Sequence, residues 1–267
     1  MFRYCLPLIP TSICTWTINI SGRYFISYLI GSDISGLYAI ANKISTIFFI
    51  ISGIFTSAWQ LSIVSYRTKP EQERFFSNVF SVYAAGSFIG ASILMAASKL
   101  IMRFLAAPDY FEAWHYAPVL ILAAVVACLG SFFSSVYVSE KHSTATLVTT
   151  VAGAVTNIAG NALLIPAWGA IGAAIATFFS YLVIFIARAI HSRKLLRIHW
   201  SILRFTISMA VLFMQCYFVE NEQLLLSIDC CIAMIALHFW PLQKVLKAEY
   251  WRFSCLKCIE NNSLNRI

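Results

Sequence analysis

The chain has 267 residues, of which 60% are hydrophobic and only 11% are charged. Soluble domains are nearer half apolar and a quarter charged, so this composition excludes an ordinary soluble protein and predicts an integral membrane protein. The formal net charge of +8 comes from cations in short loops and in the tail, with no basic stretch interleaved with aromatic residues, so we expect no nucleic-acid partner.

Long apolar runs follow one another along the chain, separated by short polar breaks. About 20 apolar residues in a helix cross the hydrocarbon core, whereas a β-barrel would need alternating strands that these continuous runs do not supply. We therefore expect an all-α integral membrane protein with about eight transmembrane helices, a six-helix bundle plus two trailing helices. The expected spans are residues 5–30, 36–65, 75–105, 116–138, 143–165, 168–190, 201–219 and 223–240. The first run has no small-residue cleavage site and reads as a retained span rather than a signal peptide.

Lys and Arg gather in alternate breaks. The cations that follow the second, fourth, sixth and eighth spans are Arg67, Lys69, Arg74, Lys141, Arg188, Arg193, Lys194, Arg197, Lys244, Lys247, Arg252, Lys257 and Arg266. The other breaks carry none, except that Lys99 and Arg103 lie near the end of the third span. Because cytoplasmic loops are enriched in cations, both termini are expected in the cytoplasm.

Two cations flank the first break, Gly31–Gly36. Arg23 and Lys43 each lie roughly seven residues from it, which predicts a similar depth of about 10 Å inside neighbouring helices. Like charges at one depth repel unless water or an anion lies between them, so a hydrated cavity for a polyanionic headgroup would account for the pair. Arg suits phosphate through its planar fork, and Lys adds a point charge. The alternative is polar packing with a Lys that snorkels outward.

The second expected span carries a polar stripe beside Lys43. Its members lie on one side of a helix: Tyr38, Asn42, Ser45, Ser52, Thr56 and Gln60. Such a stripe should face protein or water, and we expect Asn42 and Gln60 to line a path for substrate. Nearby aromatic side chains, which are also common at membrane interfaces, are candidates for sugar stacking or hydroxyl contacts: Tyr24, Tyr28 and Trp59.

The fifth and sixth spans contain polar and small residues at helical spacing. Asn157 and Asn161 share a face, where they either form inter-helix hydrogen bonds or line a wet cavity, and Pro166 is expected to end this helix. Small side chains on the next span should let helix backbones approach closely: Gly169, Ala173 and Ala176 or Thr177.

Asp229, in the last span, is a candidate for ion coupling, the alternative being a snorkelled or helix-paired carboxylate. The histidines show no zinc spacing and the pair Cys255 and Cys258 has no second pair, so we expect no metal and no cofactor. No nucleophile elbow, phosphate-binding glycine loop or paired-carboxylate motif is present, so we expect a protein that is not an enzyme.

Three stretches resemble a known family. Residues 4–45, YCLPLIPTSICTWTINISGRYFISYLIGSDISGLYAIANKIS, resemble the seventh and eighth spans of bacterial polysaccharide (O-antigen and exopolysaccharide) flippases. AWQLSIVSY, residues 58–66, resembles the end of their eighth span, and residues 149–188 resemble their eleventh and twelfth spans. These flippases belong to the multidrug/oligosaccharidyl-lipid/polysaccharide exporter superfamily.

The resemblance implies transport of undecaprenyl-pyrophosphate-linked oligosaccharide repeat units across the bacterial inner membrane, by alternating access around a cationic cavity. Arg23 and Lys43 would then contact the pyrophosphate. The implied partners are the lipid-linked oligosaccharide, membrane lipids and other polysaccharide-assembly proteins. Residues 1–192 would form the second six-helix bundle, 193–240 two additional helices and 241–267 a basic cytoplasmic tail.

Two departures from the family pattern leave alternatives open. Gly22 stands where the family usually has Asp before the Arg-Tyr pair, which puts ion coupling in doubt. The chain also begins at the equivalent of the seventh span, so the first bundle is expected to be missing. The alternatives are a truncated remnant without independent activity, a related exporter of drugs or peptidoglycan precursor, and a membrane polysaccharide polymerase or ligase. The last would need a larger outward loop than the roughly ten-residue break seen here.

Overall fold

The structure, a computed structural model, describes residues 6–63, 69–139, 143–196, 198, 200–239 and 243, and within these ranges every regular element is a helix. The helices are α2 (Leu8–Leu29), α3 (Ser32–Ile63), α4 (Lys69–Leu105), the 3₁₀ helix η1 (Pro108–His115), α5 (Ala117–Ser139), α6 (Ser143–Ser192), α7 (Ile202–Glu220) and a final helix, Leu224–Phe239. Five of them are long and apolar enough to cross a membrane by length and composition. The predicted all-α membrane fold is confirmed.

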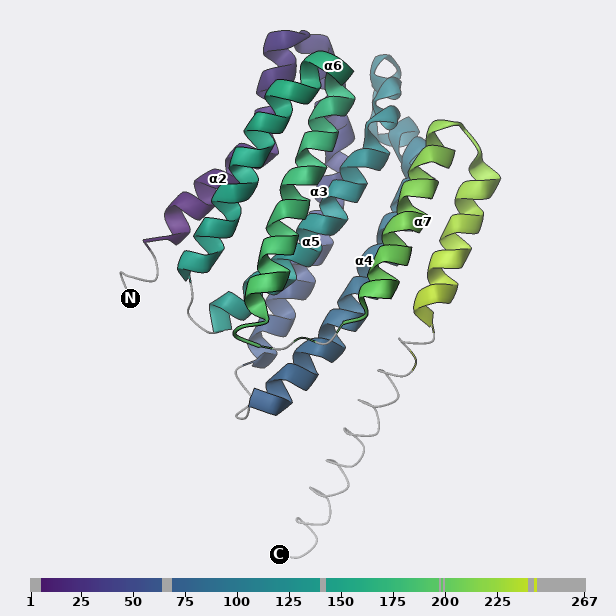
Figure 1. Cartoon of the computed structure of the whole chain (residues 1–267). Coiled ribbons are helices and arrows are strands. Elements are labelled where there is room, and N and C mark those ends of the chain that lie inside the picture. Colours follow the sequence, from purple (N-terminus) through teal and green to yellow (C-terminus); the bar gives the residue numbers. More distant parts are fainter. Residues whose placement is uncertain are drawn as a thin grey trace, which may run out of the picture.

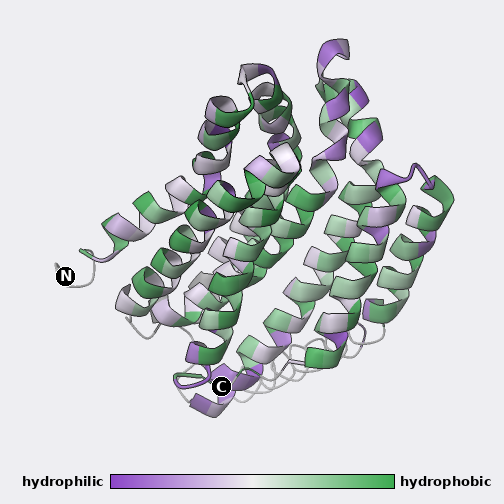
Figure 2. Ribbon diagram, turned by 45° about the horizontal axis from the view of Figure 1, so that its top comes forward, coloured by the Kyte–Doolittle hydropathy of each residue, from purple (hydrophilic) through white to green (hydrophobic). Residues whose placement is uncertain are grey.

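Helix α5 lies at the centre of the bundle. It packs against α3, α4 and α6 (Figure 1). Most of its side chains are buried. A helix that is apolar on all sides is expected in this position, because every face of it meets other helices. Figure 2 shows the complementary pattern, with hydrophobic residues along the middle of the helices and hydrophilic residues toward several of their ends.

The fifth and sixth expected spans are joined in α6, which forms a hairpin of two arms (Figure 1). The chain turns at Gly169, whose φ of 61° and ψ of −144° are non-helical, rather than at Pro166, which lies inside the first arm. The prediction that Pro166 ends the helix is therefore wrong. Gly169 turns the chain because a residue without Cβ adopts positive φ at little cost.

The two arms of α6 approach each other closely. A Cβ atom on Gly160 would lie 2.9 Å from the Cβ of Ala176, closer than side chains normally pack. The Cβ of Ala173 lies 3.4 Å from the position of a Cβ added to Gly22 of α2, an ordinary van der Waals distance. The small residues of the sixth span thus bring helix backbones together, as the sequence predicts.

An aromatic cluster fills the space between α3, α4 and α5. The ring of Trp59 stacks on Phe132 with centroids 4.5 Å apart and an interplanar angle of 7°, and Phe76 meets its edge at 4.8 Å. Phe80 and Tyr83 of α4 also contact Phe132. This cluster packs the C-terminal part of α3 against α4 and α5.

The last two helices dock on α4 through buried polar groups as well as apolar contacts. Gln215 of α7 accepts a hydrogen bond from Ser92 Oγ at 2.6 Å and donates to the Ser92 carbonyl at 2.9 Å. Ser208 and His238 are hydrogen bonded at 2.9 Å, which joins α7 to the final helix. The expected tail, 241–267, lies outside the described residues except for Gln243.

Candidate functional site

Arg23 and Lys43 both lie on the exposed surface of the chain, on α2 and α3 respectively. Ser35 Oγ donates a hydrogen bond to the Arg23 carbonyl at 3.1 Å, so Ser35 is the α3 residue at the level of Arg23. Lys43 follows eight residues later, about 12 Å farther along the helix. The prediction of equal depth is therefore wrong, and repulsion between the two charges no longer implies that water or an anion lies between them.

The aromatic candidates separate into two groups. Tyr24 and Tyr28 are 67% and 90% exposed, so both remain accessible to a ligand or a partner. Trp59 is only 5% exposed and packs in the aromatic cluster described above, so its ring faces are not available for sugar stacking in this structure. Its role here is in the core.

The polar stripe of α3 faces other helices, as the sequence predicts. Tyr38, Ser45 and Ser52 are buried, and Ser52 is hydrogen bonded to Tyr83 of α4. Asn42 is half-buried and lines a narrow cleft between α2, α3, α5 and α6, which Asn19 and Ser45 also line. Gln60 lies in α3, but its side chain is outside those that the structure describes.

Asn157 and Asn161 form the centre of a buried network between α2 and the two arms of α6. Asn157 Oδ1 accepts hydrogen bonds from Ser21 Oγ at 2.5 Å and from Asn161 Nδ2 at 3.0 Å. Asn161 also donates to Ser21 Oγ at 3.0 Å, and Asn157 Nδ2 donates to Thr177 Oγ1 at 3.5 Å. Of the two alternatives, inter-helix hydrogen bonding is the one the structure supports.

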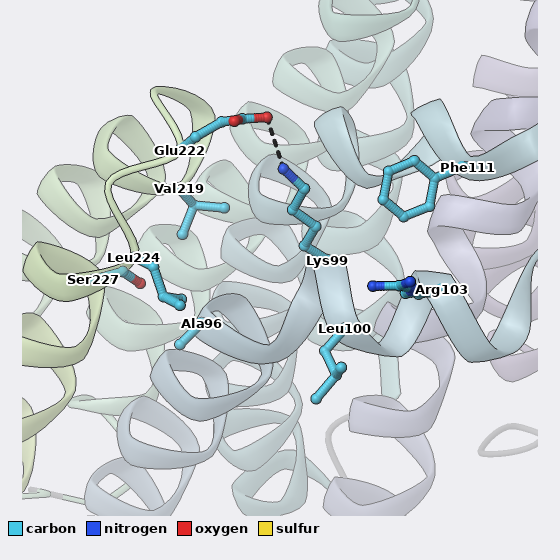
Figure 3. A pocket seen from close by; sticks show the side chains of 9 residues that line it. All are labelled: Ala96, Lys99, Leu100, Arg103, Phe111, Val219, Glu222, Leu224 and Ser227. Carbon is cyan, nitrogen blue, oxygen red and sulfur yellow. Dashed lines mark hydrogen bonds and ion pairs between the residues drawn. The ribbon is translucent and has the colours of Figure 1, made fainter.

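Lys99 and Arg103 are the two cations that depart from the charge pattern. They line a pocket of about 380 Å³ between α4, η1 and the turn that follows α7 (Figure 3). Lys99 forms an ion pair with Glu222, with Nζ and Oε1 2.7 Å apart, and its ammonium lies 4.7 Å from the ring centroid of Trp114. The positive charge of Lys99 is therefore compensated by an acidic residue in a neighbouring turn. Asp229 is exposed on the final helix and has no ion-pair partner in the described part of the chain.

Arg188 is a buried cation, although it is counted above among the cations that follow the sixth expected span, residues 168–190. It lies in the second arm of α6 and is only 8% exposed. Its Nε donates to Thr149 Oγ1 at 3.2 Å, Nη1 to the Gly130 carbonyl at 3.1 Å, and Nη2 to Thr150 Oγ1 at 3.0 Å. Its place inside a helix agrees with the expected span, 168–190, and its grouping with the cytoplasmic loop cations is wrong. The signal that it belongs to the helix was the apolar pair, Ala189 and Ile190, that follows it.

Comparison with known proteins supports the fold. No family model and no curated protein sequence matches the chain. Among solved structures it is similar to one described as lipid II flippase MurJ, inward closed conformation, with a TM-score of 0.62 and 14% sequence identity. The match covers 89% of this chain and 53% of that one, so the chain spans about half the length of the structure it matches. The chain is thus a multi-pass membrane protein with the helical arrangement of part of a flippase.

Proposed function

We propose that the chain is one helical bundle of a transporter that moves a lipid-linked, phosphate-bearing oligosaccharide across the bacterial inner membrane. The observation that carries this proposal is the fold, which 89% of the chain shares with a lipid II flippase. The transported precursor is an undecaprenyl-pyrophosphate-linked repeat unit of O-antigen or exopolysaccharide, in line with the sequence resemblance. A second bundle, on the same polypeptide or on another, completes the transporter, because the match spans only 53% of the flippase chain.

In this proposal the exposed cations face the space between the two bundles. Arg23 and Lys43 contact the pyrophosphate from different depths, so they act in succession as the headgroup moves rather than as a single clamp. Tyr24 and Tyr28 are exposed on the same helix as Arg23 and supply sugar contacts. Asn42 and Gln60 line the path along α3, and Asp229 is the candidate for ion coupling. Alternation between inward-open and outward-open arrangements of two bundles moves the substrate.

Complementation of a strain that lacks its polysaccharide flippase tests this function. Loss of one charge-assisted hydrogen bond costs about 1.5–3 kcal/mol, or roughly 10–100-fold in binding. We therefore expect R23A and K43A each to lower surface polysaccharide at matched protein levels, and the double variant to abolish it. R103A is the matched control, since Arg103 is an exposed cation on α4. Normal complementation by the R23A/K43A variant would remove these residues from the proposed site.

A peptidoglycan-precursor flippase is the second candidate, because the structural match is to a lipid II flippase. The same plasmids in a strain depleted of its lipid II flippase distinguish the two substrates. Both strains should also be tested with a first bundle supplied in trans. Failure in every combination would identify the chain as a remnant without transport activity.

A further inference from the structure

A polar cavity of about 310 Å³ lies between α2, α3, α5 and α6, in the half of the bundle where α6 ends. Each of these helices contributes at least one Ser or Thr hydroxyl to its wall, including Thr15, Thr56, Ser134 and Thr146. At about 30 Å³ per molecule in the liquid, this volume corresponds to roughly ten waters. The cavity is therefore large enough for a small polyatomic ion with part of its hydration shell.

Among the described residues that line this cavity, Arg188 is the charged one and none is acidic. A guanidinium group has five N–H donors, and among the described residues Arg188 forms three hydrogen bonds, all to neutral oxygens of Gly130, Thr149 and Thr150. Neither of the ion pairs found in the described part of the chain involves Arg188. A buried charge without a counter-charge is unfavourable, so the site favours an anion that enters the cavity.

Two hydroxyls in the wall are also free to donate. Ser134 and Thr146 have side-chain oxygens with no hydrogen-bond partner within the described ranges. By contrast, Thr15, Thr56 and Ser131 donate to carbonyls of their own helices. Spare donors on one cationic and two neutral side chains give the cavity the chemistry of an oxyanion site.

We propose that this cavity binds a phosphate group, with the guanidinium of Arg188 as the counter-charge and Ser134 and Thr146 as further donors. The planar fork of Arg suits tetrahedral oxyanions better than a single-atom anion such as chloride. The phosphate is either free inorganic phosphate or the headgroup of a phosphorylated lipid; only the second source rests on the proposed function. Arg188 is distinct from Arg23 and Lys43, which lie on the exposed surface.

Thermal unfolding of the full chain in detergent tests the site. The probes are inorganic phosphate, inorganic pyrophosphate and farnesyl diphosphate, with chloride at equal ionic strength and farnesol as controls. A ligand that binds only the folded state raises the melting temperature in a saturable way. We expect saturation with at least one phosphate probe, loss of that shift in R188Q, and its retention in R193Q, which removes an exposed cation just beyond α6.

The wall hydroxyls keep the proposal testable if R188Q does not fold. S134A and T146V should each weaken the binding of the same probe by about 3–10-fold, which is the effect of one lost hydrogen bond. Equal shifts in the wild type and R188Q, or equal affinities in S134A, T146V and the wild type, would overturn the site, as would the absence of a saturable shift with all three probes. A response to inorganic phosphate but not to farnesyl diphosphate supports the site and assigns it to the free ion. Phosphate binding without complementation in either flippase-deficient strain would contradict the proposed function alone.

Discussion

The ammonium of Lys99 donates a hydrogen bond to Glu222 Oε1 over 2.7 Å, joining α4 to the turn after α7. Lys99 departs from the otherwise regular alternation of breaks that carry Lys and Arg with breaks that carry neither. Glu222 pairs with its charge, and the ring centroid of Trp114 lies 4.7 Å from its ammonium. These two contacts accommodate a cation at an end of the bundle where the breaks carry no Lys or Arg. The pair also links the trailing helices to the bundle.

This ion pair predicts a pH dependence of stability. The hydrogen bond from Lys99 and its charge lower the pKa of the Glu222 carboxyl. The contribution of the pair is therefore fully present above the unfolded carboxyl pKa of about 4.3 and is lost as pH falls through the lower folded value. We expect part of the fall in melting temperature between about pH 5 and pH 3 to disappear in E222Q. D109N, which removes an exposed carboxylate of η1, should leave that slope unchanged; an equal slope in E222Q and the wild type would contradict the assignment.

The buried asparagine network predicts a stability loss that is specific to Asn157. In N157A, Ser21 and Asn161 lose their common acceptor in a site where Asn157 and Asn161 are both fully buried. An unsatisfied buried polar group costs about 1–3 kcal/mol, and hydrogen bonds between membrane helices average about 0.6 kcal/mol, so we expect a loss of roughly 1–2 kcal/mol. Unfolding by denaturant in detergent measures it. T156A is the control, because the Thr156 hydroxyl donates to the Ala152 carbonyl of its own helix and to no other described residue. An equal loss in both variants would remove the special role of the network.

Two glycines predict opposite effects of the same substitution. A Cβ atom on Gly172 would collide with the backbone carbonyl of Leu164 across the α6 turn, whereas nothing lies within 4 Å of a Cβ on Gly86 in α4. Overpacking costs about 1–3 kcal/mol, and Ala in place of Gly within a helix gains about 1 kcal/mol. We therefore expect G172A to lower the melting temperature and G86A to raise it. A stabilised G172A would show that the close approach of the two arms is not required.

The helices were predictable because the membrane imposes their length, and apolar runs of that length stand out in the sequence. The depth of Arg23 and Lys43 was not predictable by counting from the break, because residues 32–36 of that break are already helical in α3. Only Ile30 and Gly31 separate α2 from α3, so Lys43 lies farther along its helix than expected.

The burial of Arg188 was hidden for a different reason. Its hydrogen-bond acceptors come from Gly130 on α5 and from Thr149 and Thr150 on the first arm of α6, at least 38 residues away in the chain. No local periodicity encodes that arrangement. The apolar residues Ala189 and Ile190 put the cation inside the expected span, 168–190, and its positive charge favoured grouping it with the loop cations rather than with buried residues.

Trp59 is buried and Tyr28 is exposed, so truncating these two aromatic side chains should affect stability differently. Truncating a buried aromatic side chain costs about 3–5 kcal/mol, whereas exposed substitutions usually stay within about 0.5 kcal/mol. We expect W59A to destabilise the chain severely and Y28A to leave its stability unchanged. Chemical denaturation followed by near-UV circular dichroism measures both. A neutral W59A would return Trp59 to the list of candidate sugar contacts.

The orientation of the bundle predicts which engineered cysteines are accessible from outside the cell. The α2–α3 turn and the turn after α7 lie at the same end of the bundle, and the chain after α6 lies at the other (Figure 1). The cation-poor breaks are expected outside, because Lys and Arg are retained in the cytoplasm. In a background without native cysteines, S32C and N221C should react with a membrane-impermeant maleimide in spheroplasts, and R193C should react only after permeabilisation. The reverse pattern would invert the orientation, placing the Arg188 cavity toward the outer face and leaving Arg23 toward the cytoplasm. Labelling of all three from one side would contradict the arrangement of helices itself, because Ser32 and Arg193 stand at opposite ends of the bundle.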